Sequence, residues 1–144
     1  MSFHEKITSS GHILYWIPDE KNIINSNKVL GMDLDWTIIK PVKGKIYPID
    51  ENDWEFITEN ISRIKEFIDK GYKFVIFTNQ GGLLGSKGGK MDVEGFKRRW
   101  HIIQDRLEKE HGIAPLALIA SLLKAIFISP VSGLLVINQA SYII

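Results

Sequence analysis

Three buried strand-like segments alternate with two amphipathic segments, and this order limits the possible folds more than any other feature of the chain. The strand-like segments are Lys28–Asp35, Lys73–Thr78 and Leu116–Leu123, each an apolar run beside polar turns. Between them, apolar residues recur at steps of four, three and four, which is the period of one face of an α-helix. Strands that alternate with helices form parallel sheets with right-handed crossovers. We therefore expect an α/β fold, a Rossmann-like parallel sheet with helices on both faces.

Both amphipathic segments carry residues that typically begin and end helices. Asp53 is the expected N-cap of the first helix and Gly71 its end, while Asp92 and Gly112 have these roles in the second. The apolar stripes consist of Ile57, Ile61, Ile64 and Ile68 in the first segment and Phe96, Trp100, Ile103 and Leu107 in the second.

Two further segments lie outside this alternation. His12–Ile17 is a short apolar run, and we expect it to form an edge strand. Trp36–Asp50 is rich in Lys, Gly and Pro, which is typical of a loop or hairpin, with Lys43-Gly44-Lys45 at the turn.

Charge is distributed unevenly along the chain. There are 18 Lys and Arg against 17 Asp and Glu, so the net charge of +1 indicates neither a nucleic-acid nor a membrane partner. No acid follows Glu110, and Lys124 is the only charged residue from Ile113 onward. Ser, Pro, Gly, Asn and Gln interrupt this apolar stretch too often for a helix of ~20 residues that spans a membrane. No membrane span is therefore expected.

The length of 144 residues suits one domain, and no repeat or Pro/Gly-rich linker marks a second. We expect a single domain over 1–144, in which 1–11 are flexible and 113–144 form a divergent apolar tail. The chain has no Cys, and its N-terminal sequence has no apolar core of a signal peptide. Both features suit an intracellular protein, nuclear or cytoplasmic.

Two carboxylates follow the first buried segment. Asp33 and Asp35 are two residues apart, so both point to the same side of an extended chain. Such a pair is stable only with a cation, a shared proton or hydrogen-bond donors nearby. Ligands of open α/β sheets bind beyond the carboxyl ends of the strands, where this pair falls. The alternative is a pair of acids that cap the strand and face solvent.

The second buried segment ends in Thr78 and Asn79, followed by Gln80-Gly81-Gly82. A hydroxyl, an amide and free backbone N–H groups at this point suit a phosphate oxyanion, and the alternative is a polar turn. A P-loop is not supported, because Gly82 would need a second glycine at the position of Lys87.

These motifs resemble those of the haloacid dehalogenase superfamily of phosphotransferases. Asp33-Leu-Asp-Trp-Thr37 resembles its DxDxT motif, and Phe77-Thr78-Asn79 resembles its second motif. Gly44-Lys-Ile-Tyr-Pro48 and Gly71-Tyr-Lys-Phe-Val-Ile-Phe-Thr-Asn-Gln80 are similar to one branch, the 3′-phosphatase domain of polynucleotide kinase 3′-phosphatases.

The resemblance implies hydrolysis of phosphomonoesters at DNA or RNA 3′ ends in nucleic-acid repair. Asp33 would be the nucleophile that forms an aspartyl-phosphate, and Asp35 would protonate the leaving oxygen and later activate water. Mg²⁺ would be held by an oxygen of Asp33 and the main-chain carbonyl of Asp35. Thr78 and Asn79 would hold the transferred phosphoryl group.

Three features depart from the family pattern. Trp36 stands where the family has a small residue, and it could crowd the nucleophile or stack on a base. Ser129 precedes Pro130 where the third motif has Lys, and Lys124 lies five residues upstream. Since no acid follows Glu110, the metal-binding acids of the fourth motif are absent. We therefore expect a truncated fold with weak magnesium binding, on the order of 1 mM.

These departures leave three hypotheses. The first is an active 3′-phosphatase-like enzyme whose missing metal ligand comes from water or a partner chain. The second is a catalytically inactive, truncated remnant that at most binds phosphate or nucleic-acid ends. The third is a membrane-associated or oligomeric protein that uses its apolar tail. We expect Leu134–Ile144 to expose an apolar face and to promote self-association.

Overall fold

Six strands form one sheet in the order β1-β2-β7-β6-β3-β8, and its centre consists of the three buried segments predicted from the sequence. These are β3 (Val29–Met32), β6 (Lys73–Asn79) and β7 (Ala117–Ser121), and β6 runs parallel to both of its neighbours. The computed structural model describes residues 3–9, 11–18, 28–84, 91–123 and 134–137, the last group by its backbone alone. The predicted α/β class and the parallel core are confirmed.

Antiparallel strands extend the parallel core on both sides. β1 (Phe3–Ile7) pairs with β2 (His12–Trp16), and β2 also pairs with β7. The predicted edge strand is therefore an inner strand, and β1 is the edge that protects it. β1 lies within 1–11, the segment expected to be flexible.

The other side of the sheet ends in β8 (Leu134–Ile137), which pairs antiparallel with β3. Part of the predicted apolar tail thus adds its backbone to the sheet. The side chains of Leu134–Ile144 lie outside the described residues, so the self-association expected of this segment stays a prediction. In the part of the chain that the structure describes, no helix is long and apolar enough to cross a membrane.

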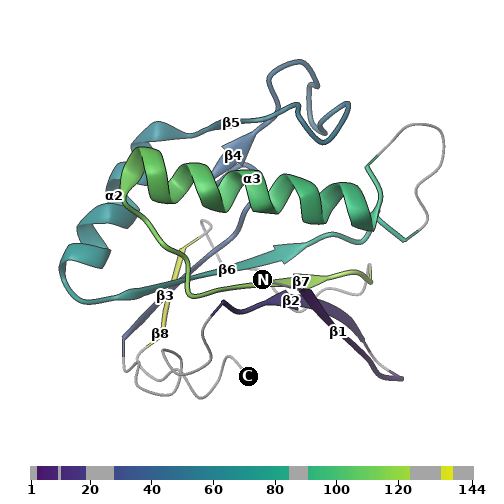
Figure 1. The fold of residues 1–144 in the computed structure, drawn as a ribbon, viewed down its shortest axis with the longest axis horizontal. Coiled ribbons are helices and arrows are strands. Elements are labelled where there is room, and N and C mark those ends of the chain that lie inside the picture. The colour runs from purple at the N-terminus through teal and green to yellow at the C-terminus, as the bar shows by residue number, and fades with distance from the viewer. Residues whose placement is uncertain (1–2, 10, 19–27, 85–90, 124–133, 138–144) are drawn as a thin grey trace.

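Both described helices lie on the same face of the sheet (Figure 1). α2 (Thr58–Asp69) connects β3 to β6, and α3 (Val93–His111) connects β6 to β7. The two crossovers step along the sheet in the same direction, so right-handed connections place both helices on one side. The expectation of helices on both faces is wrong for these two helices, because it took no account of strand order.

α3 forms as its sequence predicts. The Asp92 carboxylate accepts the backbone N–H of Gly95 at 2.8 Å and caps the helix. Gly112 ends the helix in the left-handed conformation, with φ 66°. The predicted stripe is fully buried against the sheet, and its members are Phe96, Trp100, Ile103 and Leu107.

α2 begins differently from the prediction. Its N-cap is Ile57, which makes no side-chain cap, and the helix starts one residue later at Thr58. Asp53 is not the cap, because its carboxylate binds the preceding loop instead. Ile61 and Ile64 are buried as expected, and Gly71, with φ 94°, follows the end of the helix.

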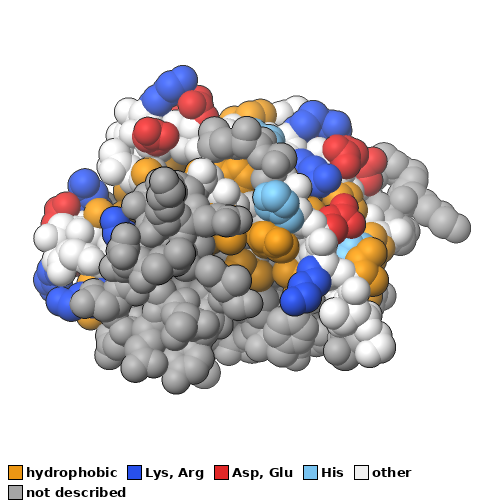
Figure 2. Space-filling model, turned by 60° about the horizontal axis from the view of Figure 1, so that its bottom comes forward, with side chains coloured by type: hydrophobic (Ala, Val, Ile, Leu, Met, Phe, Trp, Pro, Cys, Tyr) orange, Lys and Arg blue, Asp and Glu red, His pale blue; other side chains and the backbone are white. Residues whose placement is uncertain are grey.

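The two faces of the sheet carry cores of different size. The helix face holds the main cluster, in which strand residues such as Leu30 and Ile76 join the stripes of both helices. The opposite face has a smaller cluster built on Val29, Val75, Leu116 and Ala117. Figure 2, turned towards this side, shows hydrophobic side chains at the surface beside the residues that are not described.

A two-stranded ribbon stands apart from the main sheet. β4 (Ile39–Lys40) pairs antiparallel with β5 (Glu55–Phe56), and the residues between them form a long loop. The predicted loop or hairpin is thus a hairpin whose second strand lies beyond Asp50.

The orientation of α3 can be tested with two adjacent isoleucines. Ile103 is fully buried, whereas Ile102 is 43% exposed. Ile103→Ala should lower the free energy of unfolding by about 2–5 kcal/mol, since it leaves a cavity in the core. Ile102→Ala should change it by less than about 0.5 kcal/mol. Urea unfolding of both variants measures the difference, and equal losses would contradict the buried face assigned to α3.

Candidate active site

The predicted acid pair lies at the carboxyl end of β3. Asp33 directly follows the strand, and the fully buried Leu34 separates it from Asp35. The backbone N–H of Leu34 donates to Asp33 Oδ1 at 2.8 Å. Met32 is in register with Ile76 of the neighbouring parallel strand. The ends of β3 and β6 are therefore adjacent, which confirms the expected placement of Asp33 and Thr78 at neighbouring strand ends.

Gln80 connects the two strand ends by hydrogen bonds. Its Nε2 donates to Asp35 Oδ2 at 2.7 Å and to Thr78 Oγ1 at 2.8 Å. Gln80 and Thr78 are both buried, so water competes little for these bonds. The Asp35 carboxylate and the Thr78 hydroxyl thus both lie within hydrogen-bond distance of one nitrogen.

A buried arginine approaches Asp35 from α3. Arg99 Nη2 lies 3.8 Å from Asp35 Oδ1, and the arginine side chain is 2% exposed. The guanidinium also lies over the Phe96 ring, 5.7 Å from its centroid. Burial lowers the pKa of Arg99 and the Asp35 carboxylate opposes this shift, but an arginine stays charged in either case. Asp35 therefore has an amide donor on one oxygen and a cation near the other.

Asp33 has a different environment. Burial raises the pKa of this carboxyl group, and the nearby negative charge of Asp35 also raises it, while the hydrogen bond from Leu34 opposes both. The ionised form of Asp33 would thus be stabilised by a cation placed between the two acids.

Asn79 ends β6, one residue after Thr78. Side chains alternate along a strand, so Asn79 leaves β6 from the face opposite to that of Thr78. The structure therefore joins Asp35 to Thr78 and places Asp33 close enough to Asp35 for their charges to interact, whereas Asn79 starts from the face opposite to that of Thr78. The roles assigned to these four residues stay predictions. Lys124 and Ser129 lie outside the described residues.

The sequence motifs predicted no role for two residues of this cluster, Gln80 and Arg99. Gln80 was one of several polar groups after the strand, and its bond to Asp35 spans 45 positions. The sequence did contain an indication that Arg99 is buried. Arg99 directly precedes Trp100 and follows Phe96 by three positions, so it lies beside the apolar stripe of α3. A charged residue on the buried face of a helix needs a partner, and here that partner is Asp35.

Trp36 turns the chain immediately after Asp35. Its φ of 62° lies in the left-handed region, which is unfavourable by roughly 1–2 kcal/mol for a residue other than glycine. Its backbone N–H donates to the Ile39 carbonyl at 2.7 Å, and its indole Nε1 donates to the Ile46 carbonyl at 3.0 Å. The half-exposed ring is thus anchored to the hairpin loop. Glycine would adopt this backbone conformation at lower cost than tryptophan.

Asp53 organises that loop. Its carboxylate accepts the backbone N–H groups of Lys43 at 2.7 Å and of Val42, Gly44 and Ile49 at 2.9 Å each. The hydrogen bond from Lys43 and the other three together lower the pKa of Asp53 from its ordinary 3.8 to about 2, against the opposing effect of burial. One buried carboxylate therefore fixes the loop that holds Trp36.

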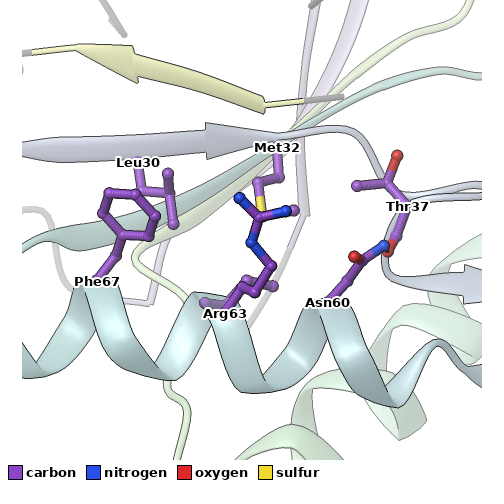
Figure 3. A pocket seen from close by; sticks show the side chains of 7 residues that line it. Leu30, Met32, Thr37, Asn60, Arg63 and Phe67 are labelled. Carbon is purple, nitrogen blue, oxygen red and sulfur yellow. The ribbon is translucent and has the colours of Figure 1, made fainter. Parts of the chain in front are cut away.

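A separate hollow of about 50 Å³ lies between β3 and α2. In Figure 3, Arg63 reaches from α2 towards Met32, and Asn60 points to Thr37, whose carbonyl accepts its amide at 2.7 Å. Neither Asp33 nor Asp35 lines this hollow, and its volume suits one or two water molecules rather than a nucleotide. It is not the site of the predicted chemistry.

Metal ligands are few in the described ranges. No three side chains of His, Cys, Asp or Glu there come together as a group that could hold a metal ion. Asp33 and the main chain of Asp35 are the candidate ligands that the sequence predicted. Both supply the hard oxygen atoms that Mg²⁺ prefers.

Comparison with known proteins covers most of the chain. The sequence model of the polynucleotide kinase 3 phosphatase family matches residues 28–142, a range that contains every residue of the cluster. The bifunctional polynucleotide phosphatase/kinase of Schizosaccharomyces pombe is 27% identical over 110 residues, which cover 76% of this chain and 25% of the relative. The chain thus matches about a quarter of the length of that relative.

The role of Asp53 predicts a dependence of stability on pH. Because folding lowers its pKa from 3.8 to about 2, its stabilising effect is fully present above pH 3.8 and is lost as the pH falls towards 2. Asp53→Asn should lower the unfolding midpoint at pH 7, since an uncharged amide accepts fewer hydrogen bonds. The difference in unfolding midpoint between the wild type and Asp53→Asn should be smaller at pH 3 than at pH 7. Urea titrations at both pH values measure it, with the exposed Asp50→Asn as control; a constant gap would contradict the assignment.

Gly44 provides a second test of the loop. A Cβ atom at this position would lie 1.8 Å from the carbonyl oxygen of Tyr47, whereas a Cβ at Gly82 would have no neighbour within 4 Å. Gly44→Ala should therefore destabilise the protein by about 1–3 kcal/mol, as overpacking does. Gly82→Ala should have little effect. Thermal unfolding compares the two variants, and similar midpoints would show that the loop has another conformation.

Proposed function

Since the chain belongs to the polynucleotide kinase 3 phosphatase family, we propose that it removes the phosphate from the 3′ end of a nucleic acid, DNA or RNA. The observation that carries this proposal is the hydrogen-bonded connection of Asp35 to Thr78 through Gln80, beside Asp33, at adjacent ends of parallel strands. We also propose a haloacid dehalogenase-like mechanism for this reaction.

Asp33 acts as the nucleophile. A carboxylate oxygen attacks phosphorus, the bond from phosphorus to the 3′ oxygen breaks, and Asp35 gives that oxygen its proton. Asp35 then accepts a proton from a water molecule that attacks the aspartyl-phosphate. Inorganic phosphate leaves and the Asp33 carboxylate is restored. The two carboxylates have different environments, because Asp35 has the contacts with Gln80 and Arg99.

Thr78 and Asn79 hold the transferred phosphoryl group. Thr78 Oγ1 accepts a hydrogen bond from Gln80, so its own O–H proton remains available for a phosphate oxygen. The amide of Asn79 is the second proposed donor, and it would reach the phosphoryl group from the other side of the strand end. Together with the backbone N–H groups that follow, these donors suit an oxyanion.

Mg²⁺ fits this donor set. It commonly keeps several waters and is bound by one or two carboxylates together with oxygens of a substrate phosphate. Asp33 offers a carboxylate whose ionised form gains from a cation, and Asp35 offers its main-chain carbonyl. When bound, the metal reduces the repulsion between carboxylate and phosphate. With so few carboxylates, its dissociation constant should be on the order of 1 mM.

A second candidate function has support from the sequence. Ser129 stands where the resemblance to the family places a Lys. Loss of this cation would weaken catalysis more than it weakens phosphate binding. The alternative is therefore a protein that binds phosphate or nucleic-acid ends without turning them over.

Release of phosphate from a 3′-phosphorylated oligonucleotide in the presence of Mg²⁺ tests the proposed function. We expect turnover of this substrate and little turnover of the 5′-phosphorylated oligonucleotide of the same sequence. Asp33→Asn should lower kcat by more than about 10³-fold, because it removes the nucleophile. Asp50→Asn is the matched control, since its exposed carboxylate lies outside the cluster.

Equal rates for the wild type and a folded Asp33→Asn variant would contradict the assignment of the nucleophile. Binding of the 3′-phosphorylated oligonucleotide without release of phosphate would instead support the inactive alternative.

A further inference from the structure

Arg99 is buried, but its contacts with the described residues satisfy only part of the hydrogen-bonding capacity of its guanidinium. Among the described residues it is the only buried Lys or Arg. Within the described ranges its one ion pair is the 3.8 Å approach to Asp35, and its buried Nε has no hydrogen-bond partner there. A guanidinium taken out of water with unmatched donors is unfavourable for folding. This arrangement points to a role in the site rather than to stability alone.

The geometry of Asp35 shows what Arg99 can do. Gln80 donates to Oδ2 of the carboxylate at 2.7 Å, and Arg99 Nη2 lies 3.8 Å from Oδ1, an ionic approach that is longer than a hydrogen bond. The two supports come from different elements, the end of β6 and the first half of α3. The hydrogen bond and the ionic attraction together favour one orientation of the carboxylate, which proton transfer to a fixed leaving group requires.

The charge of the site supports the same conclusion. Asp33 and Asp35 are both acidic, and a phosphomonoester adds up to two further negative charges. The sequence has Ser129 at the position of the third-motif lysine, so it lacks a cation there. Arg99 is a cation that the described structure places 3.8 Å from one member of the acid pair, Asp35.

We propose that Arg99 is a positioning residue that orients Asp35 and supplies the neutralising charge that the third-motif position lacks. The inference rests on the proposed function, because orientation of Asp35 matters only if Asp35 transfers a proton. The second effect proposed for Arg99 is its positive charge. This charge should strengthen the binding of any phosphate group at the site, whether or not a proton is transferred.

Variants of two adjacent arginines provide the test. Arg99→Met keeps an unbranched side chain and removes the charge, and Arg99→Lys keeps the charge without the planar fork. Arg98→Met is the control, because Arg98 is exposed and pairs with Glu51 at 2.8 Å, away from the cluster. The measurements are the affinity for inorganic phosphate and the kcat and KM for the 3′-phosphorylated oligonucleotide.

Arg99→Met should weaken the affinity for inorganic phosphate about tenfold and lower kcat by about 10- to 100-fold, as loss of an orienting group does. Arg99→Lys should recover most of the phosphate affinity and little of kcat, since it restores charge but not orientation. Arg98→Met should match the wild type in both. If Arg99→Met fails to fold, the Arg99→Lys variant still tests the split between affinity and kcat.

A folded Arg99→Met variant that matches the wild type in phosphate affinity and kcat would overturn the proposal and leave Arg99 a structural residue. Absence of turnover by the wild type would reject the proposed function instead. The charge element of the Arg99 proposal would then be decided by phosphate affinity alone, and equal affinities of the wild type and Arg99→Met would overturn it.

Discussion

The parallel pairing of β3 with β6 is the constraint on which the site depends. It places the residue after Met32 beside the end of β6, so that an acid pair and a hydroxyl group from distant parts of the chain meet at one edge of the sheet. Gln80 then converts this proximity into defined geometry by bonding Asp35 and Thr78 from one nitrogen. Both helices pack on one face, and α3 brings Arg99 to the same edge.

Electrostatics explains why these groups are found together. Two carboxylates separated by one residue repel each other where water is partly excluded, and burial raises the pKa of Asp33 further. The positive charge of the buried Arg99 guanidinium, beside Asp35, offsets part of this repulsion. A metal ion between the acids would add to the same compensation, which is why the proposals for Mg²⁺ and for Arg99 are complementary.

The hairpin loop is built around a different carboxylate. Asp53 holds four backbone N–H groups, and the close approach of Gly44 to the Tyr47 carbonyl leaves no room for a side chain. The indole of Trp36 joins this loop to the turn that follows Asp35. The position of the loop beside the acid pair thus depends on a carboxylate that takes no part in the proposed chemistry.

Local patterns in the sequence were sufficient for several features of this protein. Periodicity located the parallel strands and the buried stripe of α3, and Asp92 and Gly112 marked the ends of that helix, because each signal depends on residues within a few positions of one another. The motif resemblance placed Asp33 and Thr78 at neighbouring strand ends for a similar reason, since each motif is a short run at the end of a strand.

Only the tertiary structure decided the order of the strands, the single face that both helices share, the inner position of β2, and the partners of Asp53 and Asp35. Each of these is a contact between segments far apart in the chain: Gln80 lies 45 positions from Asp35, and Arg99 lies on another element. Local preference cannot specify such contacts, because an aspartate that could cap a helix can equally bind a loop. Which partner it takes is determined by the donors that packing brings within hydrogen-bond distance.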